Sequence, residues 1–430
     1  MPSVEDHPLR YALANELHAR PFPSLATPSM AIFLAIKQRS GAVARDRAKD
    51  LEHLITLLDR HGSAHPQPGA THFYTQIGRY WLKWEQHTEF VTYTLFCSGV
   101  SERAFDPDLF DILPEDWLAQ APGQRLTSAL VRITSAPRDE ADLLGALEAW
   151  FVPESMVVSD VLEDTAIVAS DFRIDPAGHM RFAVFTKDNS DDRRVGRMVQ
   201  RLLEIETYKT ISLLGFTRAR SISGRIGQLD TRLTELMIEM TEDAKPADQI
   251  LPELLAISSE LETMAAQASF RFGATGAYNA IVMDRIEGLQ EARVAGRTTF
   301  SEFMSRRFDP AMRTVDSTEA RLQRLADRAM RAGDLLRTRV DVERSAQNQA
   351  LLESMDRRAD MQLRLQHTVE GLSVVAISYY AVSLVGYLLG PLGGILGIDK
   401  GGVTALITLP VVLAVWLAVR RIRRRLNRDK

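Results

Sequence analysis

The sequence predicts an α+β protein with a cytoplasmic, mostly antiparallel sheet domain, a helical bundle with a long stalk helix, and a C-terminal two-helix transmembrane hairpin. Segments with strand character are confined to about the first 190 of the 430 residues. After Asp191, apolar residues recur at helical spacing, and two uncharged apolar segments occupy residues 371–389 and 403–419. We therefore expect four parts: an α+β domain (1–190), a helical domain (191–310), a stalk helix (311–370) and a transmembrane hairpin with a basic cytoplasmic tail (371–430).

The first domain begins with a buried strand, MAIFLAIK, at residues 30–37. Residues 43–60 follow as an amphipathic helix, because apolar residues stand at positions 51, 54, 55 and 58. The segments HFYTQI, RYWLKWEQ and EFVTYTLFC are rich in aromatic and β-branched residues and are separated by short polar breaks, which predicts an antiparallel meander. Cys97 on the last of these strands is expected to be a small buried hydrophobic residue.

The second half of this domain mixes helices and strands. A helical segment around residues 107–118 precedes the strand LTSALVRITS and a helix over 140–151. The strands TAIVASDFRID and MRFAVFTKD flank a turn at Pro176, Ala177 and Gly178, so we expect them to form a hairpin.

Strands are expected to cease after Asp191. Glu204 and Glu206 are two apart on the first long helix and face different sides, which argues against a carboxylate pair. Pro246 and Pro252 mark a turn before a second helix that runs to about residue 291, and residues 296–309 form a break. Small residues recur at every fourth position of the first helix and predict close helix packing: Gly215, Ala219, Ser223 and Gly227.

The stalk has no proline between residues 311 and 389. This stretch can form one helix about 110 Å long at 1.5 Å per residue, continuous with the first apolar segment. Apolar residues alternate at spacings of three and four, which predicts coiled-coil packing: Leu322, Leu325, Ala329, Ala332 and Leu336.

The two apolar segments are long enough to cross a hydrocarbon core of about 30 Å, and Pro410 in the second is tolerable in a membrane. Trp416 fits an interfacial anchor. Because positive residues favour the cytoplasm, we expect a bacterial inner (cytoplasmic) membrane protein with both termini cytoplasmic. The loop 390–402 holds only Asp399 and Lys400, whereas the hairpin's two flanks carry arginines: Arg357, Arg358 and Arg364 before it, and Arg420, Arg421, Arg423, Arg424, Arg425 and Arg428 after it.

Composition limits the partners. The formal net charge is −4, so a global basic excess of the kind that binds nucleic acid is absent. The opening MPSVEDHPLR lacks the basic and apolar regions of a signal peptide, and we expect no export of the large domain. A single cysteine cannot form an internal disulfide, which agrees with a reducing cytoplasm.

Motifs for catalysis or cofactor binding do not occur. The sequence contains no P-loop, no dinucleotide-binding GxGxxG after a strand, no CxxC pair and no HExxH. His61 and His65 are expected in a loop and His72 on a strand, so they do not predict a metal site. The acidic run from Asp106 imitates a calcium loop, but Asp111 stands where glycine is required. We predict a protein that is not an enzyme and has no cofactor or metal.

One polar cluster near the N-terminus stands out, in the segment NELHARPFP at residues 15–23. Its side chains are either a ligand or partner contact, or caps and salt bridges that pin the N-terminal arm to the domain. The cluster comprises Asn15, Glu16, His18 and Arg20.

The same segment, together with QRLLEIETYK at 200–209 and LRLQHTVEGLSVVAISYY at 363–380, resembles a bacterial family of uncharacterised membrane-anchored proteins known as domain of unknown function 3422. The resemblance covers essentially the whole chain. It implies an inner-membrane anchor and no assigned activity, so no functional residues carry over.

The expected architecture is also similar to that of CorA-type magnesium channels. Those channels carry a Gly-Met-Asn motif at the end of the first span, where this chain reads GYLLGP at 386–391. We therefore expect a cytoplasmic sensing, binding or scaffolding domain on a membrane anchor. The alternative is a CorA-like homo-oligomeric ion channel or transporter without that motif. In both cases we expect a lipid bilayer and further copies of the chain as partners, with an ion or small ligand unidentified.

Overall fold

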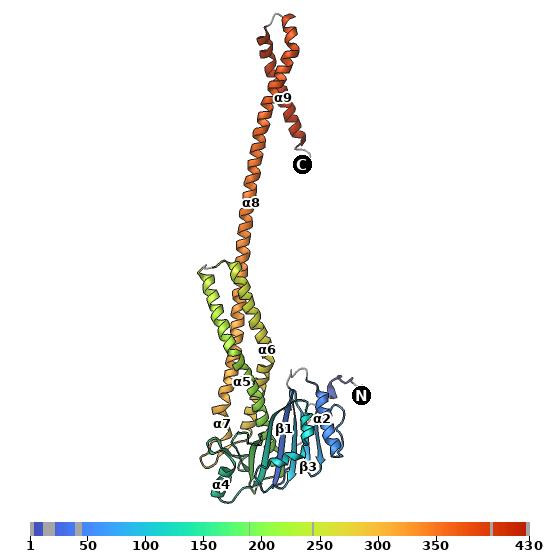
Figure 1. Ribbon diagram of the computed structural model, residues 1–430, viewed down its shortest axis with the longest axis vertical. Coiled ribbons are helices and arrows are strands. Elements are labelled where there is room, and N and C mark those ends of the chain that lie inside the picture. The colour runs from blue at the N-terminus through green and yellow to red at the C-terminus, as the bar shows by residue number, and fades with distance from the viewer. Residues whose placement is uncertain are drawn as a thin grey trace. The chain divides into compact units, whose positions relative to one another are not determined.

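The computed structural model describes residues 4–11, 22–38, 45–188, 190–242, 245–395 and 399–426 (Figure 1). The chain divides into two compact units, Met1–Gly333 and Asp334–Lys430. The α+β class predicted from the sequence is confirmed, because the first unit combines a sheet with long helices. The finer division into four parts stays a prediction.

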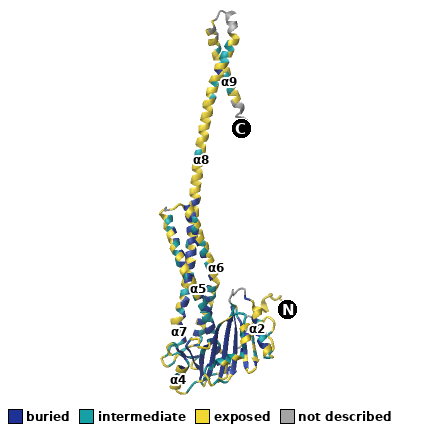
Figure 2. Ribbon diagram, in the orientation of Figure 1, coloured by how far each residue is buried: buried dark blue, intermediate teal, exposed yellow. Residues whose placement is uncertain are grey.

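The first unit is built on a sheet of nine strands among the described residues, in the order β2-β3-β4-β1-β5-β8-β7-β6-β9. Neighbouring strands pair antiparallel, except that β5 and β8 run parallel. The central strands are mostly buried, as Figure 2 shows. The strands are β1 (Ser29–Lys37), β2 (His72–Ile77), β3 (Tyr80–Gln86), β4 (Phe90–Ser98), β5 (Gln124–Ser135), β6 (Val157–Val161), β7 (Ala166–Ser170), β8 (Met180–Thr186) and β9 (Ala292–Arg293).

Short helices cover one face of this sheet. Trp84, Tyr93 and Trp117 are fully buried in the core that they form with it. His53 of α2 stacks on Trp117 with ring centroids 3.9 Å apart, which fixes α2 against α3. The elements on this side are α2 (Arg47–Arg60), η2 (Pro107–Ile112), α3 (Glu115–Ala119), α4 (Glu140–Trp150) and η3 (Pro153–Ser155).

The opposite face is covered by the first turns of α5 (Asp192–Thr241), which packs along α6 (Ala247–Glu287). A Cβ atom added to Gly215 would lie 2.1 Å from the Thr275 hydroxyl oxygen, so glycine permits the close approach of the two helices there. A Cβ on Gly227 would meet nothing within 4 Å. The predicted small-residue stripe therefore mediates close packing at its N-terminal end and not at Gly227.

After α7 (Phe300–Arg307), the single helix α8 (Asp309–Ile395) begins. Its first part lies against α5, because Arg321 and Arg328 both donate hydrogen bonds to Asp230. The predicted apolar seam is buried, with exposed fractions from 0% to 4%: Leu322, Leu325, Ala329, Ala332 and Leu336. Coiled-coil packing with other copies stays a prediction.

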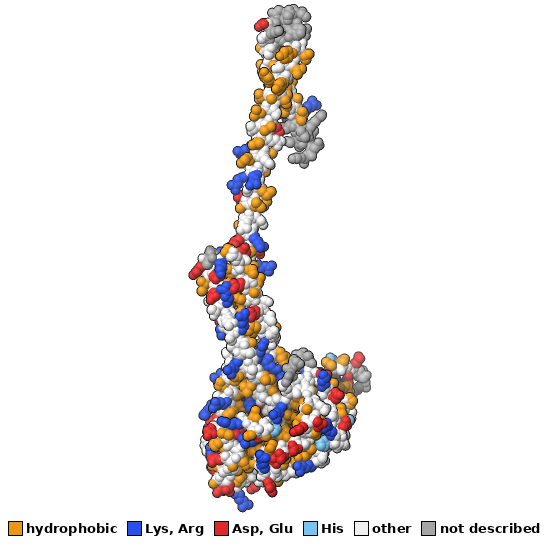
Figure 3. Space-filling view, viewed as in Figure 1, with side chains coloured by type: hydrophobic (Ala, Val, Ile, Leu, Met, Phe, Trp, Pro, Cys, Tyr) orange, Lys and Arg blue, Asp and Glu red, His pale blue; other side chains and the backbone are white. Residues whose placement is uncertain are grey.

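The second unit comprises the rest of α8 and helix α9 (Lys400–Leu426). A Cβ on Gly386 would lie 3.7 Å from Ile407, so the two helices contact each other. The helices within Phe300–Leu389 and Thr404–Ile422 are long and apolar enough to cross a membrane, with mean hydropathy 1.9 in each. Most of their large apolar side chains are exposed, and hydrophobic side chains are prominent on the visible face in Figure 3. Length, composition and exposure together indicate membrane association.

Several local predictions are corrected. Strands do not cease at Asp191, because β9 pairs with β6, and neither strand was predicted. The predicted break over 296–309 contains α7, which starts at a capping box between Thr299 and Glu302. Pro252 lies inside α6 and not in a turn, and α6 ends at Glu287. Strand β9 has only two residues, too few to show a periodicity in the sequence, so only its pairing with β6 identifies it.

Candidate functional site

A cavity of about 300 Å³ opens between the sheet and the two long helices of the first unit. Its floor is formed by β3 and β4, and its side by α5 and α6. One part of the lining is charged or polar: Lys83, Glu85, Gln200, Glu204 and Arg285. Another part is aromatic or apolar: Phe22, Phe33, Phe90, Phe96, Leu203 and Tyr208.

Strand and helix periodicity bring these side chains together. Lys83 and Glu85 are two residues apart on β3 and therefore share one face of the sheet. The register sets them opposite Thr94 and Thr92 of β4, which also line the cavity. On α5, residues 200, 204 and 208 recur every fourth position, so one helix face points at this part of the sheet.

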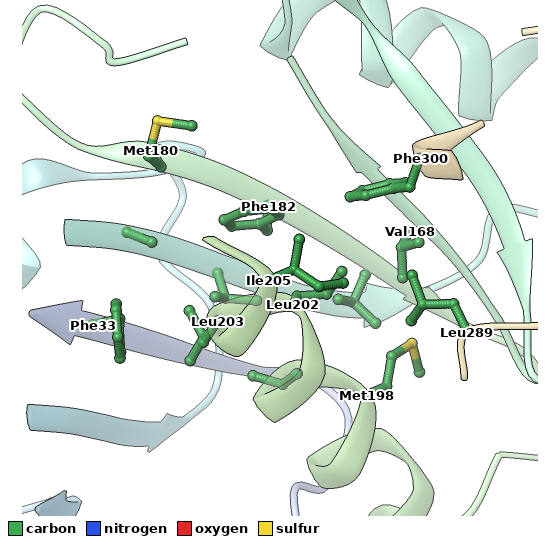
Figure 4. Close-up of a cluster of buried hydrophobic side chains, with 14 of the residues drawn as sticks. Phe33, Val168, Met180, Phe182, Met198, Leu202, Leu203, Ile205, Leu289 and Phe300 are labelled. Carbon is green, nitrogen blue, oxygen red and sulfur yellow. The ribbon is translucent and has the colours of Figure 1, made fainter. Parts of the chain in front are cut away.

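The apolar part of the lining is continuous with the core. Phe33 and Leu203 belong to the cluster between the sheet and α5, and Figure 4 shows them facing each other at one end of it. Phe90 stacks on His87, with ring centroids 4.4 Å apart, and Tyr208 meets Phe90 edge to face at 6.0 Å. A ligand in the cavity would thus contact apolar rings on one side.

The polar groups form a chain of alternating charge along the cavity wall. Lys83 Nζ lies 3.1 Å from Glu85 Oε2 and donates to Gln200 Oε1 at 2.8 Å. Gln200 Nε2 donates to Glu204 Oε1 at 2.7 Å, and Arg285 Nε donates to Glu204 Oε2 at 2.5 Å. The side chain of Lys83 is only 5% exposed and that of Glu85 12% exposed. Each buried charge is paired, as burial requires.

A second ionic cluster next to the cavity holds the surrounding elements in place. Glu89, 1% exposed, pairs with Arg271 of α6 and lies 3.5 Å from Lys37 of β1. Burial lowers the pKa of Lys37, although Glu89 opposes the shift. Burial, followed by the nearby Glu89 charge, raises the pKa of Tyr278, which stacks on Tyr208. The cluster ties the β3–β4 turn and β1 to α6.

Another cavity, of about 370 Å³, lies on the opposite face of the sheet. His179 in its lining stacks on Phe110 at 3.9 Å and shares a hydrogen bond of 2.9 Å with Ser128 Oγ. Burial lowers the pKa of His179, with a further contribution from Arg125. Asp175 accepts a hydrogen bond from the backbone N–H of His179 and not from its ring. Asp175 therefore does not orient the His179 ring as the acid of a catalytic triad would.

The polar residues predicted from the N-terminal segment, Asn15, Glu16, His18 and Arg20, lie outside the described residues. Phe22, which belongs to the same segment and comes two residues after Arg20, lines the cavity.

The predicted membrane anchors lie on α9. The guanidinium carbon of Arg420 lies 4.8 Å from the centre of the Trp416 ring, and Arg421 is exposed. The side chain of Arg423 is outside the described part of the chain. The interfacial position of these residues stays a prediction.

The structure places two of the three histidines weighed as metal ligands. His65 Nε2 lies 2.7 Å from Asp59 Oδ1, and His72 is on β2 as predicted. Within the described residues, no group of three or more His, Cys, Asp or Glu side chains could hold a metal ion. Cys97 is buried in the core, as predicted.

The sequence did not predict the cavity, although two segments that stand out in it, residues 15–23 and 200–209, contain lining residues such as Phe22, Gln200 and Glu204. Glu204 and Glu206 do diverge: Glu204 lines the cavity, while Glu206, 2% exposed, accepts a hydrogen bond from Thr127 of β5. The available clue was a charged residue at a core-facing position, such as Lys83 in a strand otherwise rich in aromatic residues. Such residues are rarely buried without a partner.

Comparison with known proteins shows the family of the chain. Residues 5–426 match the family described as protein of unknown function (DUF3422). The chain belongs to this family. The match confirms the resemblance seen in the sequence and assigns no activity to DUF3422 proteins. The similarity to CorA-type channels stays a prediction. No curated protein matches the chain.

Proposed function

We propose that this DUF3422 protein is a membrane-anchored binding protein whose first unit takes up a small polar molecule in the cavity between β3, β4, α5 and α6. The observation that carries the proposal is the chain of paired charges from Glu85 to Arg285 along the cavity wall. Replacing a buried ion pair by apolar residues is often neutral or stabilising. Charged groups kept at a cavity are therefore better explained by recognition than by stability.

Thermal unfolding of the full-length protein in detergent tests the binding function. Metabolites are screened in four groups, anionic, cationic, zwitterionic and neutral, because a ligand that binds only the folded state raises the unfolding midpoint. We expect at least one group to raise it, and Lys83→Met to reduce the increase. Arg225→Gln is the matched control, because Arg225 pairs with Glu260 on the same two helices but outside the cavity. If no compound raises the midpoint, the binding function is wrong.

The segment before Phe22 is proposed to contribute to ligand recognition through Asn15, Glu16, His18 and Arg20. Support comes from its unusual polar sequence and from Phe22 in the cavity lining. The protein is proposed to act without catalysis or a cofactor, and nucleic acid is not a proposed partner, given the net charge of −4.

We place the anchor in the bacterial inner membrane with both termini in the cytoplasm, on the strength of the arginines that flank the hairpin. Alkaline phosphatase fused after Lys430 should be inactive, whereas the same enzyme inserted near Asp399 should be active. The reverse pattern contradicts this topology.

An ion channel or transporter is the alternative, and the length of α8 favours it, because one helix carries residues of both units. This alternative requires a homo-oligomer with a pore, whereas a binding protein requires neither. Ser373, Ser378, Ser383 and Gly386 on α8 are small residues of the kind that favour close contacts between helices in membranes. Mass measurement in mild detergent decides the oligomeric state, and a monomer at all concentrations removes the channel. Imaging of an oligomer for an axial pore separates channel from anchor.

A further inference from the structure

We infer that the cavity binds a zwitterion with an apolar side chain, the chemical class of α-amino acids, and this inference rests on the proposed binding function. The key observation is the position of Gln200 between a cation and an anion. Its carboxamide oxygen accepts from Lys83 at 2.8 Å, and its carboxamide nitrogen donates to Glu204 at 2.7 Å. The wall therefore presents a cationic donor and an anionic acceptor to one small neutral group.

A zwitterion matches the same two partners with full charges. Its carboxylate accepts from Lys83 in place of the Gln200 oxygen, and its ammonium donates to Glu204 in place of the Gln200 nitrogen. The bonds of Gln200 to Lys83 and Glu204 are already charge-assisted, but a ligand with full charges adds Coulomb attraction that the neutral carboxamide does not provide. Exchange of the carboxamide for the ligand is therefore favourable, and the flexible glutamine side chain can turn away.

The charge balance of the wall selects against ligands with a net charge. Lys83 and Arg285 are offset by Glu85 and Glu204, and each cation already lies within 3.1 Å of a carboxylate oxygen. An anion such as a phosphate ester would pair with a cation and leave a partly buried carboxylate without its partner, which is costly. A zwitterion adds one charge of each sign and keeps every charge paired.

The remaining lining accounts for the apolar side chain. Phe33, Phe90, Phe96 and Leu203 provide apolar surface beside the charged wall. The volume of about 300 Å³ is at the lower end of the range for ligand pockets, roughly 300–1,000 Å³. The cavity thus fits a single amino acid with an aromatic or branched aliphatic side chain.

Calorimetric titration of the full-length protein in detergent tests this inference with matched ligands. The first series is L-phenylalanine, phenethylamine, which lacks the carboxylate, and 3-phenylpropionate, which lacks the ammonium. The second is L-leucine, isoamylamine and 4-methylpentanoate. In at least one series, we expect the amino acid to bind at least about tenfold more tightly than either analogue, since each analogue leaves one charged partner unpaired.

Two variants test which residue binds the ammonium group of the ligand and which binds its carboxylate. Glu204→Gln should abolish the preference for the amino acid over the acid and keep the preference over the amine. Lys83→Met should do the opposite. A purely structural role for either residue would weaken all three ligands alike and would overturn the assignment. Arg225→Gln should leave every affinity unchanged. Thermal unfolding verifies that the variants are folded, and Glu204→Asp, which withdraws the carboxylate by one methylene, replaces Glu204→Gln if the latter does not fold.

The outcomes separate this inference from the function on which it rests. If an analogue with one charge binds as tightly as its amino acid, or if only another charge group of the metabolite screen binds, the zwitterion inference is wrong and the binding function stands. If no compound binds at all, both are wrong.

Discussion

The two units depart in opposite ways from the usual pattern of buried apolar and exposed charged side chains. In the first unit, charged side chains such as Lys83 and Glu89 are buried and paired. In the second, large apolar side chains such as Leu372 and Leu409 are 69% and 80% exposed. A buried charge and an exposed apolar surface each need a partner to compensate them. The charges of the first unit find that partner within the chain, whereas the exposed apolar surface of the second unit indicates association with a membrane.

The largest expected effect is the difference between one substitution made in both units. Leu202→Ala removes a fully buried side chain between α5 and the sheet, and should lower the free energy of unfolding by about 2–5 kcal/mol. Leu409→Ala removes an 80% exposed side chain and should change it by less than about 0.5 kcal/mol. Denaturant unfolding of the full chain in detergent measures both. Equal losses would show that the exposed surface of α9 is covered in the folded protein.

A smaller effect is expected where α5 and α6 approach. Gly215→Ala brings a Cβ atom into the Thr275 side chain and should destabilise the first unit by about 1–3 kcal/mol. At Gly227, where a Cβ meets nothing, Gly227→Ala should stabilise it by up to about 1 kcal/mol because alanine has the higher helix propensity. Thermal unfolding of the pair checks the prediction, which fails if both substitutions change stability in the same direction.

The buried imidazole of His53 should make the first unit sensitive to acid. Burial lowers the pKa of His53, with a smaller opposing contribution from the Trp117 carbonyl. The unfolded state therefore takes up this proton first as pH falls below about 6.5, and stability is lost on that side. The loss is at most about 1.4 kcal/mol per pH unit for one proton.

Burial raises the pKa of Asp50, which lies on the same helix, so protonation of Asp50 in the folded state adds stability as pH falls and opposes the effect of His53. The wild type must therefore be compared with a variant. Between about pH 6.5 and 5, the stability of His53→Gln should fall less than that of the wild type. Equal slopes in denaturant titrations would contradict the assignment to His53.

The smallest effect concerns fluorescence and leaves stability unchanged. Trp416 on α9 is 46% exposed, whereas Trp84 and Trp117 are fully buried in the first unit. After reconstitution, lipids with brominated acyl chains should quench the part of the emission that Trp416→Phe removes. Quenching that persists in this variant would place another tryptophan in contact with the bilayer.

Local patterns in the sequence determined many of the strands and helices of this protein. Aromatic and β-branched runs predicted strands such as β3 and β4, the absence of proline from 311 to 389 predicted most of α8, and the uncharged segments predicted the candidate spans. These features depend on residues close together in the chain, so the sequence contains all that is needed to predict them.

Only the tertiary structure decided the parallel pairing of β5 with β8, the two-residue strand β9 and the cavity. Lys83 and Gln200 are 117 residues apart in the sequence, and their hydrogen bond exists because α5 lies across β3. No local pattern encodes that distance. Which polar residues meet depends on how the sheet and helices pack, and hydrophobic burial drives that packing without specifying polar partners in advance.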